Sequence, residues 1–228
     1  MKKRVLLTPF ILAFLGGFLD IYAIMYRGGK FCFLQTGNLI YLFRDLIISD
    51  YENVLICLLI FLAFSIGLIL AYLITYFLKL KKKEKWTNVI LLSFVFILII
   101  PNYCFSETSS FDFSYIAVFM LSMVGGILLE SFRFSYVNYT STMMTNNYKL
   151  FMHSLLNRIF LKDKEEGRKS IIYILIILAF LLGVIFYTLF YKYNIIKRQI
   201  IFVPHLLLLV LIVVDVISIK KEGLVNEK

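Results

Sequence analysis

The chain has 228 residues, of which 61% are hydrophobic and only 17% charged, and its mean hydropathy is +0.88. A soluble domain of this length does not need so much apolar surface, so the composition excludes that class and predicts an integral membrane protein. The formal net charge is +10, and the basic residues cluster beside the apolar stretches, which is typical of topology signals and argues against a nucleic-acid partner.

Six stretches reach the length of about 20 apolar residues that a helix needs to cross a bilayer. The first resembles a signal peptide, but its apolar run continues past Asp20 and no A-x-A cleavage pattern follows, so we expect an uncleaved span. The sequence therefore predicts an all-α integral membrane fold with a single membrane domain over residues 1–228. In chain order, the expected spans are approximately Val5–Met25, Val54–Leu78, Thr87–Tyr103, Tyr115–Val137, Ser170–Tyr191 and Gln199–Ile219.

Basic residues precede the first span, fill the second connection (residues 79–85) and recur in the fourth connection (residues 138–169) and at the C-terminus. The third connection, NYCFSETSSFDF, contains no basic residue. The positive-inside rule then places both termini in the cytoplasm, with six spans across the cytoplasmic membrane. One short connection does not follow the positive-inside rule, because Lys192, Lys197 and Arg198 would lie outside.

The two halves of the chain match at an offset of 109 residues, the difference between positions 125 and 16. At this offset Gly16-Gly17 aligns with Gly125-Gly126, and the polar cluster after the first span aligns with a second cluster containing Thr145, Asn146 and Asn147. Three spans in each half would make the second half enter the membrane from the opposite side. We therefore expect an inverted repeat, with residues 5–105 as the first unit and 114–219 as the second.

Each polar cluster precedes a segment that is too short to span, such as Asn38–Ile48 in the first half. Such a segment fits either a re-entrant half-helix or a helix lying at the membrane surface. We expect Gly37 to allow a tight turn, and Thr36 or Asn38 to cap the first helical N–H groups. Two helix N-termini near the midplane would suit an anionic or polar solute.

The stretch GGFLDIYAIMYRGGKFCFLQTGNLIYL resembles the signature of the YoaK-like family of bacterial membrane proteins. The resemblance rests on Gly17, Asp20, Phe31 and Gln35–Asn38, and with the repeated second motif it covers nearly the whole chain. In the second half Glu130 stands near the place of the family's asparagine, and Thr145-Asn146 replaces its Thr-Gly pair. The resemblance implies an inner-membrane protein without an established biochemical activity.

Charged residues inside spans are costly, by about 2.5–3.5 kcal/mol each, and are functional candidates. Asp20 could take part in proton-coupled transport or bond to a neighbouring helix. Glu130 and Arg133 are three positions apart on one helix face and could pair. Arg44 and Asp45 are interpreted as solvated charges near the outer surface. His205 is interpreted as a packing or interhelical hydrogen-bonding residue, with a proton site as the alternative.

The leading hypothesis is a small-solute transporter or channel, with substrate-binding residues in the two polar clusters and the intramembrane charges. An assembly or regulatory protein and an intramembrane enzyme acting on lipid are the alternatives. We expect the lipid bilayer and a small polar or anionic solute as partners, leave a homo-oligomer open, and expect neither enzymatic activity nor a cofactor or metal, because no matching motif occurs. The candidate solute-binding residues are Asp20, Gln35, Thr36, Gly37, Asn38, Glu130, Arg133, Thr145, Asn146 and Asn147.

Overall fold

The computed structural model describes residues 4–27, 29–104, 111–131, 143–193 and 199–226, and within them all regular structure is helical. Short 3-10 turns at Glu84–Trp86 and Gln199–Ile201 lead into two of the helices. The α-helices are α1 (Arg4–Tyr26), α2 (Gln35–Ile47), α3 (Tyr51–Leu80), α4 (Thr87–Ile99), α5 (Pro101–Cys104), α6 (Phe111–Ser131), α7 (Met144–Phe160), α8 (Lys164–Lys192) and α9 (Phe202–Asn226).

Five described segments are long and apolar enough to cross a membrane: Leu7–Tyr26, Tyr51–Leu80, Glu84–Tyr103, Lys164–Lys192 and Phe202–Lys221. In addition, α6 has 21 residues and carries the shorter apolar segment Tyr115–Glu130. Many large apolar side chains on α3, α8 and α9 are exposed, which suits contact with lipid rather than with water. The chain is therefore a multi-pass helical membrane protein.

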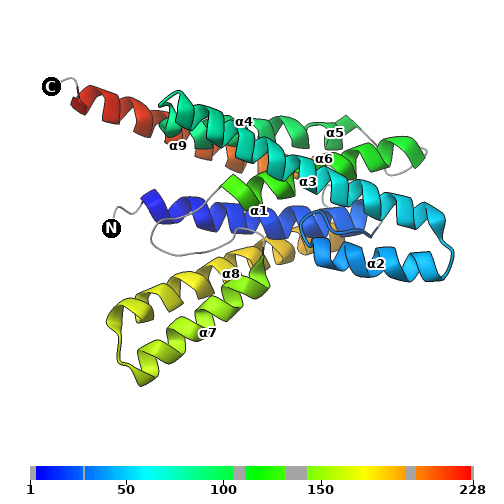
Figure 1. The fold of residues 1–228 in the computed structure, drawn as a ribbon, viewed down its shortest axis with the longest axis horizontal. Coiled ribbons are helices and arrows are strands. Elements are labelled where there is room, and N and C mark those ends of the chain that lie inside the picture. Colours follow the sequence, from blue (N-terminus) through cyan, green and yellow to red (C-terminus); the bar gives the residue numbers. More distant parts are fainter. Residues whose placement is uncertain (1–3, 28, 105–110, 132–142, 194–198, 227–228) are drawn as a thin grey trace.

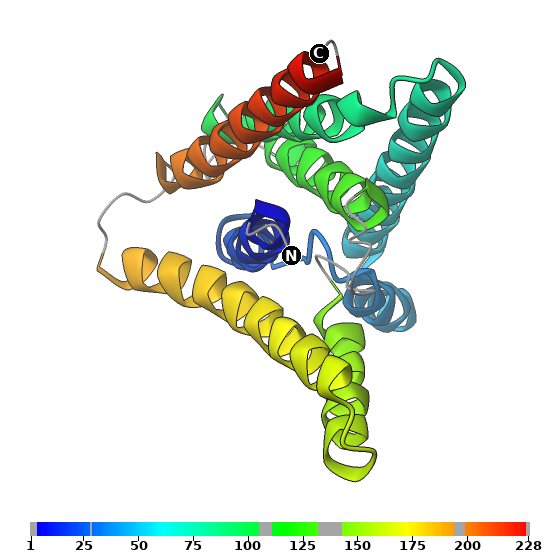
Figure 2. The ribbon, with the colours of Figure 1, turned by 90° about the vertical axis from the view of Figure 1, so that its left-hand side faces the viewer.

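The spanning helices run roughly along one direction, and α1 lies at the centre of the bundle when it is viewed along that direction (Figures 1 and 2). The two most extensive helix contacts are those between α3 and α6 and between α1 and α8. The short helix α2 packs on α3, and α7 packs on α8. The remaining helix α9 packs mainly on α4, which also contacts α6.

Glycines allow α1 and α8 to approach until their backbones touch. A Cβ atom on Gly17 would lie 2.1 Å from the carbonyl oxygen of Phe180, and one on Gly183 would lie 2.1 Å from the carbonyl oxygen of Phe14. Close backbone approach through small residues is a common way for membrane helices to associate, because lipid gives no hydrophobic drive for their contact. The two glycines therefore fix where α1 crosses α8.

Glycines also allow the backbones of α3 and α6 to come into contact. A Cβ atom on Gly67 would lie 2.2 Å from the carbonyl oxygen of Met123, and one on Gly126 would lie 2.2 Å from that of Phe64. Gly17 and Gly126 occupy equivalent positions at the offset of 109 residues found in the sequence. The two largest helix contacts are thus built alike.

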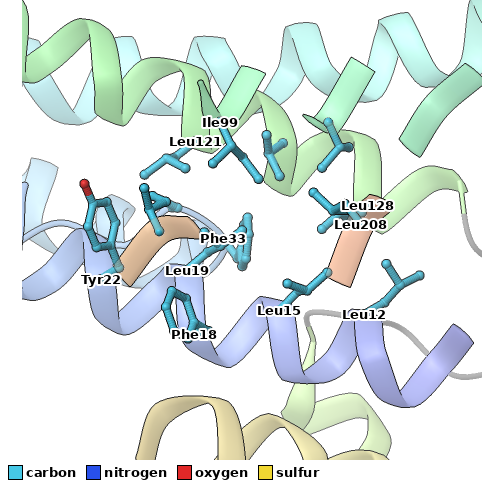
Figure 3. Close-up of a cluster of buried hydrophobic side chains, with 14 of the residues drawn as sticks. Leu12, Leu15, Phe18, Leu19, Tyr22, Phe33, Ile99, Leu121, Leu128 and Leu208 are labelled. Atoms are coloured by element: carbon cyan, nitrogen blue, oxygen red, sulfur yellow. The ribbon is translucent and has the colours of Figure 1, made fainter. Parts of the chain in front are cut away.

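The main hydrophobic core lies around the middle of the bundle. Figure 3 shows Leu12, Leu15 and Leu19 of α1 on one side of it, with Leu121 and Leu128 of α6 on the other. Ile99 of α4, Leu208 of α9 and Phe33, which precedes α2, belong to the same cluster. Phe33 shows that the segment between α1 and α2 reaches into the bundle instead of lying outside it.

The described ends of the helices gather at two opposite ends of the molecule. The two termini, the turn between α3 and α4 and the turn between α7 and α8 lie on the left in Figure 1, and the turn between α2 and α3 lies on the right. Basic residues crowd the left-hand turns, as in Lys81–Lys83 and in the pair Lys162 and Lys164. This distribution agrees with the charge asymmetry expected from the sequence.

Candidate functional site

The two short helices α2 and α7 define the candidate site. With 13 and 17 residues, they measure about 20 and 26 Å at about 1.5 Å per residue, less than the bilayer's hydrocarbon thickness of about 30 Å. Both views place their N-terminal ends near each other in the middle of the molecule, with α2 running towards the right in Figure 1 and α7 towards the left (Figures 1 and 2). The site thus lies where two helices from opposite ends meet.

Asp20 holds the segment before α2 against α1. Its carboxylate Oδ1 accepts hydrogen bonds from the backbone N–H of Cys32 at 2.9 Å and of Phe33 at 3.1 Å, and its side chain is buried. Backbone donors within a bilayer have no water to bond, so they need an acceptor from the protein. Asp20 supplies that acceptor, which fixes the position of the turn that leads into α2.

Asn38 closes the turn from the other side. Its buried amide donates to the carbonyl oxygen of Phe31 at 2.7 Å and to Gln35 Oε1 at 3.3 Å, and its Oδ1 accepts from the N–H of Phe31 at 3.2 Å. Gln35 in turn donates to the carbonyl oxygen of Cys32 at 2.9 Å. These side chains satisfy the polar backbone of a turn that lies inside the protein.

Gly37 and Thr36 occupy the first turn of α2 with different surroundings. A Cβ atom on Gly37 would come 2.9 Å from the ring of Phe31, so the glycine makes room for that ring. Thr36 is exposed. The helix begins at Gln35 with Leu34 in the capping position and no side-chain cap, so the expectation that Thr36 or Asn38 caps it is wrong.

The turn before α2 also contacts α6, from the other half of the chain. Ser122 donates from Oγ to the carbonyl oxygen of Cys32 at 3.3 Å. A Cβ atom on Gly125 would lie 2.3 Å from the ring of Phe33, so only glycine leaves space for this ring. The N-terminal end of α2 is therefore held by α1 and α6 together.

A buried ion pair fastens the rest of α2, and sequence reasoning missed it. Asp45 is fully buried and pairs with Lys30 at 3.4 Å, while Arg44 Nε donates to its Oδ1 at 2.6 Å. Lys30 and Arg44 both lie over the ring of Tyr41, at 5.1 and 5.0 Å from its centroid. The interpretation of Asp45 as a solvated charge is wrong, because the preceding turn folds Lys30 back onto it.

The turn from α2 into α3 lies outside the spanning segments and is capped by Asp50. Its Oδ2 accepts from the amide of Asn53 at 2.7 Å, and its Oδ1 accepts from the backbone N–H of Asn53 at 3.3 Å. These hydrogen bonds favour the ionised form and hold the pKa of Asp50 below its ordinary value. The cap fixes the position at which α3 begins after α2.

The start of α7 resembles that of α2 in several respects. Asn147 is fully buried, like Asn38, and its amide donates to the sulfur of Met144 at 3.7 Å. Thr145 and Asn146 are exposed, as is Thr36 in α2, and α7 likewise begins without a side-chain cap.

Two of the predicted site residues lie on or beyond the end of α6. Glu130 is partly buried near the C-terminal end of that helix. Arg133 lies outside the described residues, so the expected Glu130–Arg133 pair stays a prediction.

A second buried polar cluster, at the C-terminal end of α1, was also missed. Arg27 is buried, and its Nη2 donates to the hydroxyl of Tyr22 at 3.1 Å and to the carbonyl oxygen of Asn102 at 3.2 Å. The only signal in the sequence is a basic residue at an end of a span where the positive-inside rule expects none. The cluster ties α1 to α5.

His205 forms hydrogen bonds between helices, which is one of the roles expected for it from the sequence. Its Nε2 lies 3.2 Å from the carbonyl oxygen of Phe96, and its Nδ1 lies 3.1 Å from that of Ile201 and 3.0 Å from the hydroxyl of Tyr103. The ring thereby links α9 to α4 and α5.

Neither a curated protein nor a solved structure matches this chain. A family match covers residues 8–214, nearly the whole length, and it bears out the resemblance to a family of membrane proteins without an assigned activity. By this match the chain belongs to the family described as "Protein of unknown function (DUF1275)".

Proposed function

We propose that this protein is a small-solute transporter or channel of the cytoplasmic membrane, with its solute path between the facing ends of α2 and α7. One observation carries the proposal: two helices too short to span begin near each other in the middle of the molecule and run to opposite ends (Figures 1 and 2). Non-helical backbone at membrane depth is tolerated where protein covers it or where it lines a water-filled space. Interrupted helices of this kind are a common way to build a transport site.

The pairing of the helices supports the six-span inverted repeat on which this proposal rests. At the offset seen in the sequence, α1, α2, α3 and α4 correspond to α6, α7, α8 and α9. The contact between α1 and α8 then has its counterpart in that between α6 and α3, and the contact between α2 and α3 in that between α7 and α8. The first helix of each half thus packs on the third helix of the other half, which an approximate two-fold axis in the membrane plane would produce.

The partial charge at the ends of two helices indicates the kind of solute. The N-terminal end of a helix carries a partial positive charge of about half an elementary charge. Neither α2 nor α7 has a side-chain cap that would neutralise this end. Two such ends near each other favour an anion or a strongly polar small solute.

We assign the predicted site residues two roles. Thr36, Thr145 and Asn146 are exposed at the helix starts and would contact the solute. Asp20, Gln35, Gly37, Asn38 and Asn147 would hold the backbone of the site in place, as the bonds and contacts of the first four around Phe31–Phe33 indicate. Glu130 and Arg133 complete the second half of the site in this proposal.

The proposed orientation places both termini in the cytoplasm. The termini and the lysine-rich turns lie at one end of the molecule, and this end would face the cytoplasm by the positive-inside rule. The proposal gives the chain no catalytic reaction.

Uptake by reconstituted vesicles tests the proposal. Purified protein is incorporated into liposomes, and the uptake of a panel of inorganic anions, amino acids and small metabolites is compared with that of protein-free liposomes. We expect uptake of at least one polar or anionic solute, and a decrease of about ten-fold or more in Thr36→Ile and in Thr145→Ile, because a lost hydrogen-bonding group in such a site costs about 1–3 kcal/mol.

Thr188→Ile is the matched control. Thr188 is also exposed, but it lies on α8 and its hydroxyl bonds to the carbonyl oxygen of Val184 in its own helix. Its substitution is expected to leave uptake unchanged. Uptake no greater than that of protein-free liposomes for the entire panel, or equal uptake by all three variants, would overturn the proposal.

A membrane assembly or regulatory protein is the second candidate, and one observation favours it. Thr36 lies on the same side of α2 as Ile40, Phe43 and Ile47, and all four are exposed. A helix face of this kind could meet another membrane protein instead of lining a path through this one. This candidate predicts no uptake in the same vesicles, together with a loss of complex size in native membranes on Phe43→Ala.

A further inference from the structure

An open pocket of about 470 Å³ lies between α7 and α8, close to the turn that joins them. It lies at the C-terminal end of α7, opposite to the start of that helix that carries the proposed function. The residues that line it are Arg158, Lys164, Gly167, Arg168, Ser170 and Ile171. Three of these six residues are cationic and none is acidic.

The nearby acidic groups are already engaged elsewhere. Asp163 caps α8 by accepting the N–H of Glu165 at 2.8 Å and of Glu166 at 3.3 Å. Glu166 accepts from Lys169 at 2.7 Å and from Ser154 at 2.8 Å, and Glu165 pairs with the same lysine at 3.9 Å.

By contrast, Lys164 and Arg168 have no ion pair with any residue that the structure describes. The pocket therefore keeps its positive charge.

The position of Arg158 is built into the fold. Its Nη1 donates to the carbonyl oxygen of Lys162 at 3.0 Å, and Lys162 takes up a left-handed backbone conformation with φ of 56° at the turn. A Cβ atom on Gly167 would lie only 2.8 Å from Cδ of Arg158. Glycine at this position thus allows the guanidinium-bearing side chain of α7 to lie across α8.

Apolar side chains surround the charged pocket. Ile159, Phe160 and Leu161 at the end of α7 and Ile171 on α8 are all strongly exposed. The largely charged segment 164–169 of α8 precedes its apolar run, which begins with Ile171, so the pocket lies where a polar helix end becomes a membrane span. This is the level of the lipid headgroups, where exposed apolar side chains would contact acyl chains.

We propose that this pocket binds the phosphate group of an anionic phospholipid, with Arg158, Lys164 and Arg168 around the phosphate and the apolar rim against the acyl chains. Arginine is suited to this task, because its planar guanidinium can donate two parallel hydrogen bonds to phosphate oxygens. Basic pockets at helix ends on the cytoplasmic side are known sites for acidic lipid headgroups. The bound lipid would fix the α7–α8 hairpin at the membrane surface.

Native mass spectrometry of the full chain, released from detergent, tests this site with phosphatidylglycerol as the probe and phosphatidylcholine as the neutral comparison. We expect one tightly held phosphatidylglycerol, and binding at least about ten-fold weaker in Lys164→Gln/Arg168→Gln, since a basic residue near the headgroups contributes about 1 kcal/mol. Gly167→Leu fills the pocket without changing its charge and should weaken binding to a similar degree.

Lys81→Gln/Lys82→Gln is the matched control, because it removes two exposed lysines from the other basic turn at the same end of the molecule. This variant should bind phosphatidylglycerol like the wild type. Equal weakening in the control, or wild-type binding by Gly167→Leu, would overturn the proposal in favour of diffuse charge attraction. Full displacement of the lipid by millimolar inorganic phosphate would overturn it in favour of a site for free phosphate.

Discussion

The carboxylate of Asp20 accepts hydrogen bonds from two successive backbone N–H groups, those of Cys32 and Phe33. In a bilayer no water is available to accept hydrogen bonds from these donors, so each of the two N–H groups would be unsatisfied without Asp20. A hydrogen bond to a charged acceptor is also about twice as strong as one between neutral groups. At the scale of single residues, this pair of bonds is the contribution of α1 to holding the start of α2 inside the molecule.

Asp20→Ala should therefore destabilise the protein. Two buried N–H groups lose their acceptor, at about 1–3 kcal/mol each, so we expect the free energy of unfolding in detergent to fall by about 2–4 kcal/mol. Asp20→Asn keeps one acceptor oxygen and should cost less than Asp20→Ala. Thermal or denaturant unfolding of the purified variants measures both changes.

Asp215→Asn serves as the control, because Asp215 lies in the spanning part of α9 and its buried Oδ2 has no hydrogen-bond partner among the described residues. It should change stability much less than Asp20→Ala does. If Asp20→Ala unfolds like the wild type while the pH dependence of uptake disappears, Asp20 is a proton carrier and not an anchor.

Sequence reasoning picked out Asp20 and Asn38 but could not give their bonding partners. Both residues bond to backbone atoms of Phe31–Phe33, and backbone groups carry no signal in the sequence. The same limit hid the burial of Asp45, which depends on how the preceding turn brings Lys30 back to it. An unusual residue can thus be recognised from its surroundings in the sequence, whereas its role depends on the fold.

At the scale of helices, the glycine contacts decide which helix packs on which. Gly17 and Gly183 join α1 to α8, and Gly67 and Gly126 join α3 to α6. In each case the atom that a side chain would strike belongs to the neighbouring backbone, which cannot move aside by a change of rotamer. These contacts should therefore tolerate no side chain at all.

Gly126→Ala tests this directly. The added methyl group would lie 2.2 Å from the carbonyl oxygen of Phe64, so α3 and α6 must separate. Overpacking of this kind costs about 1–3 kcal/mol, and we expect a loss of unfolding free energy at the upper end, about 3 kcal/mol. The measurement is detergent unfolding, as for Asp20.

Gly29→Asn is the appropriate comparison for that variant. Gly29 has φ of 72°, and a Cβ atom added to it would meet no described atom within 4 Å. Asparagine tolerates this backbone conformation, so the cost of the substitution should stay below about 1 kcal/mol. A Gly126→Ala protein as stable as Gly29→Asn would show that the helices can move apart freely.

Helix boundaries show where hydropathy stops being informative. The predicted span Thr87–Tyr103 consists of α4 and α5, which meet at Pro101, since proline cannot donate the next helical hydrogen bond. Helix α8 begins at Lys164 instead of Ser170, because Asp163 caps a polar first turn that no apolar pattern reveals. Helix α2 begins at Gln35, three residues before the expected start at Asn38.

At the scale of the whole molecule, charge and hydropathy predicted a multi-pass helical protein with its basic turns at one end, and the described residues have both features. The alignment of the two halves of the sequence depended on a few glycine and polar residues, such as Gly17, Gly126, Asn38 and Asn147. Those residues are the ones that the fold uses for close helix contacts or buries at the starts of the short helices. The packing of the first helix of each half on the third helix of the other half could not be predicted, because no local sequence pattern indicates which helices are in contact.

The central claim is that α2 and α7 enter the membrane from opposite sides, and labelling of single cysteines tests it most directly. Ile47 at the end of α2 and Phe160 at the end of α7 are 82% and 76% exposed, so a cysteine at either place should react readily. In a background without the three native cysteines, a membrane-impermeant maleimide is applied to intact cells and to inverted membrane vesicles. The account predicts that Ile47→Cys reacts only in intact cells and Phe160→Cys only in inverted vesicles; reaction of both from the same side would contradict it.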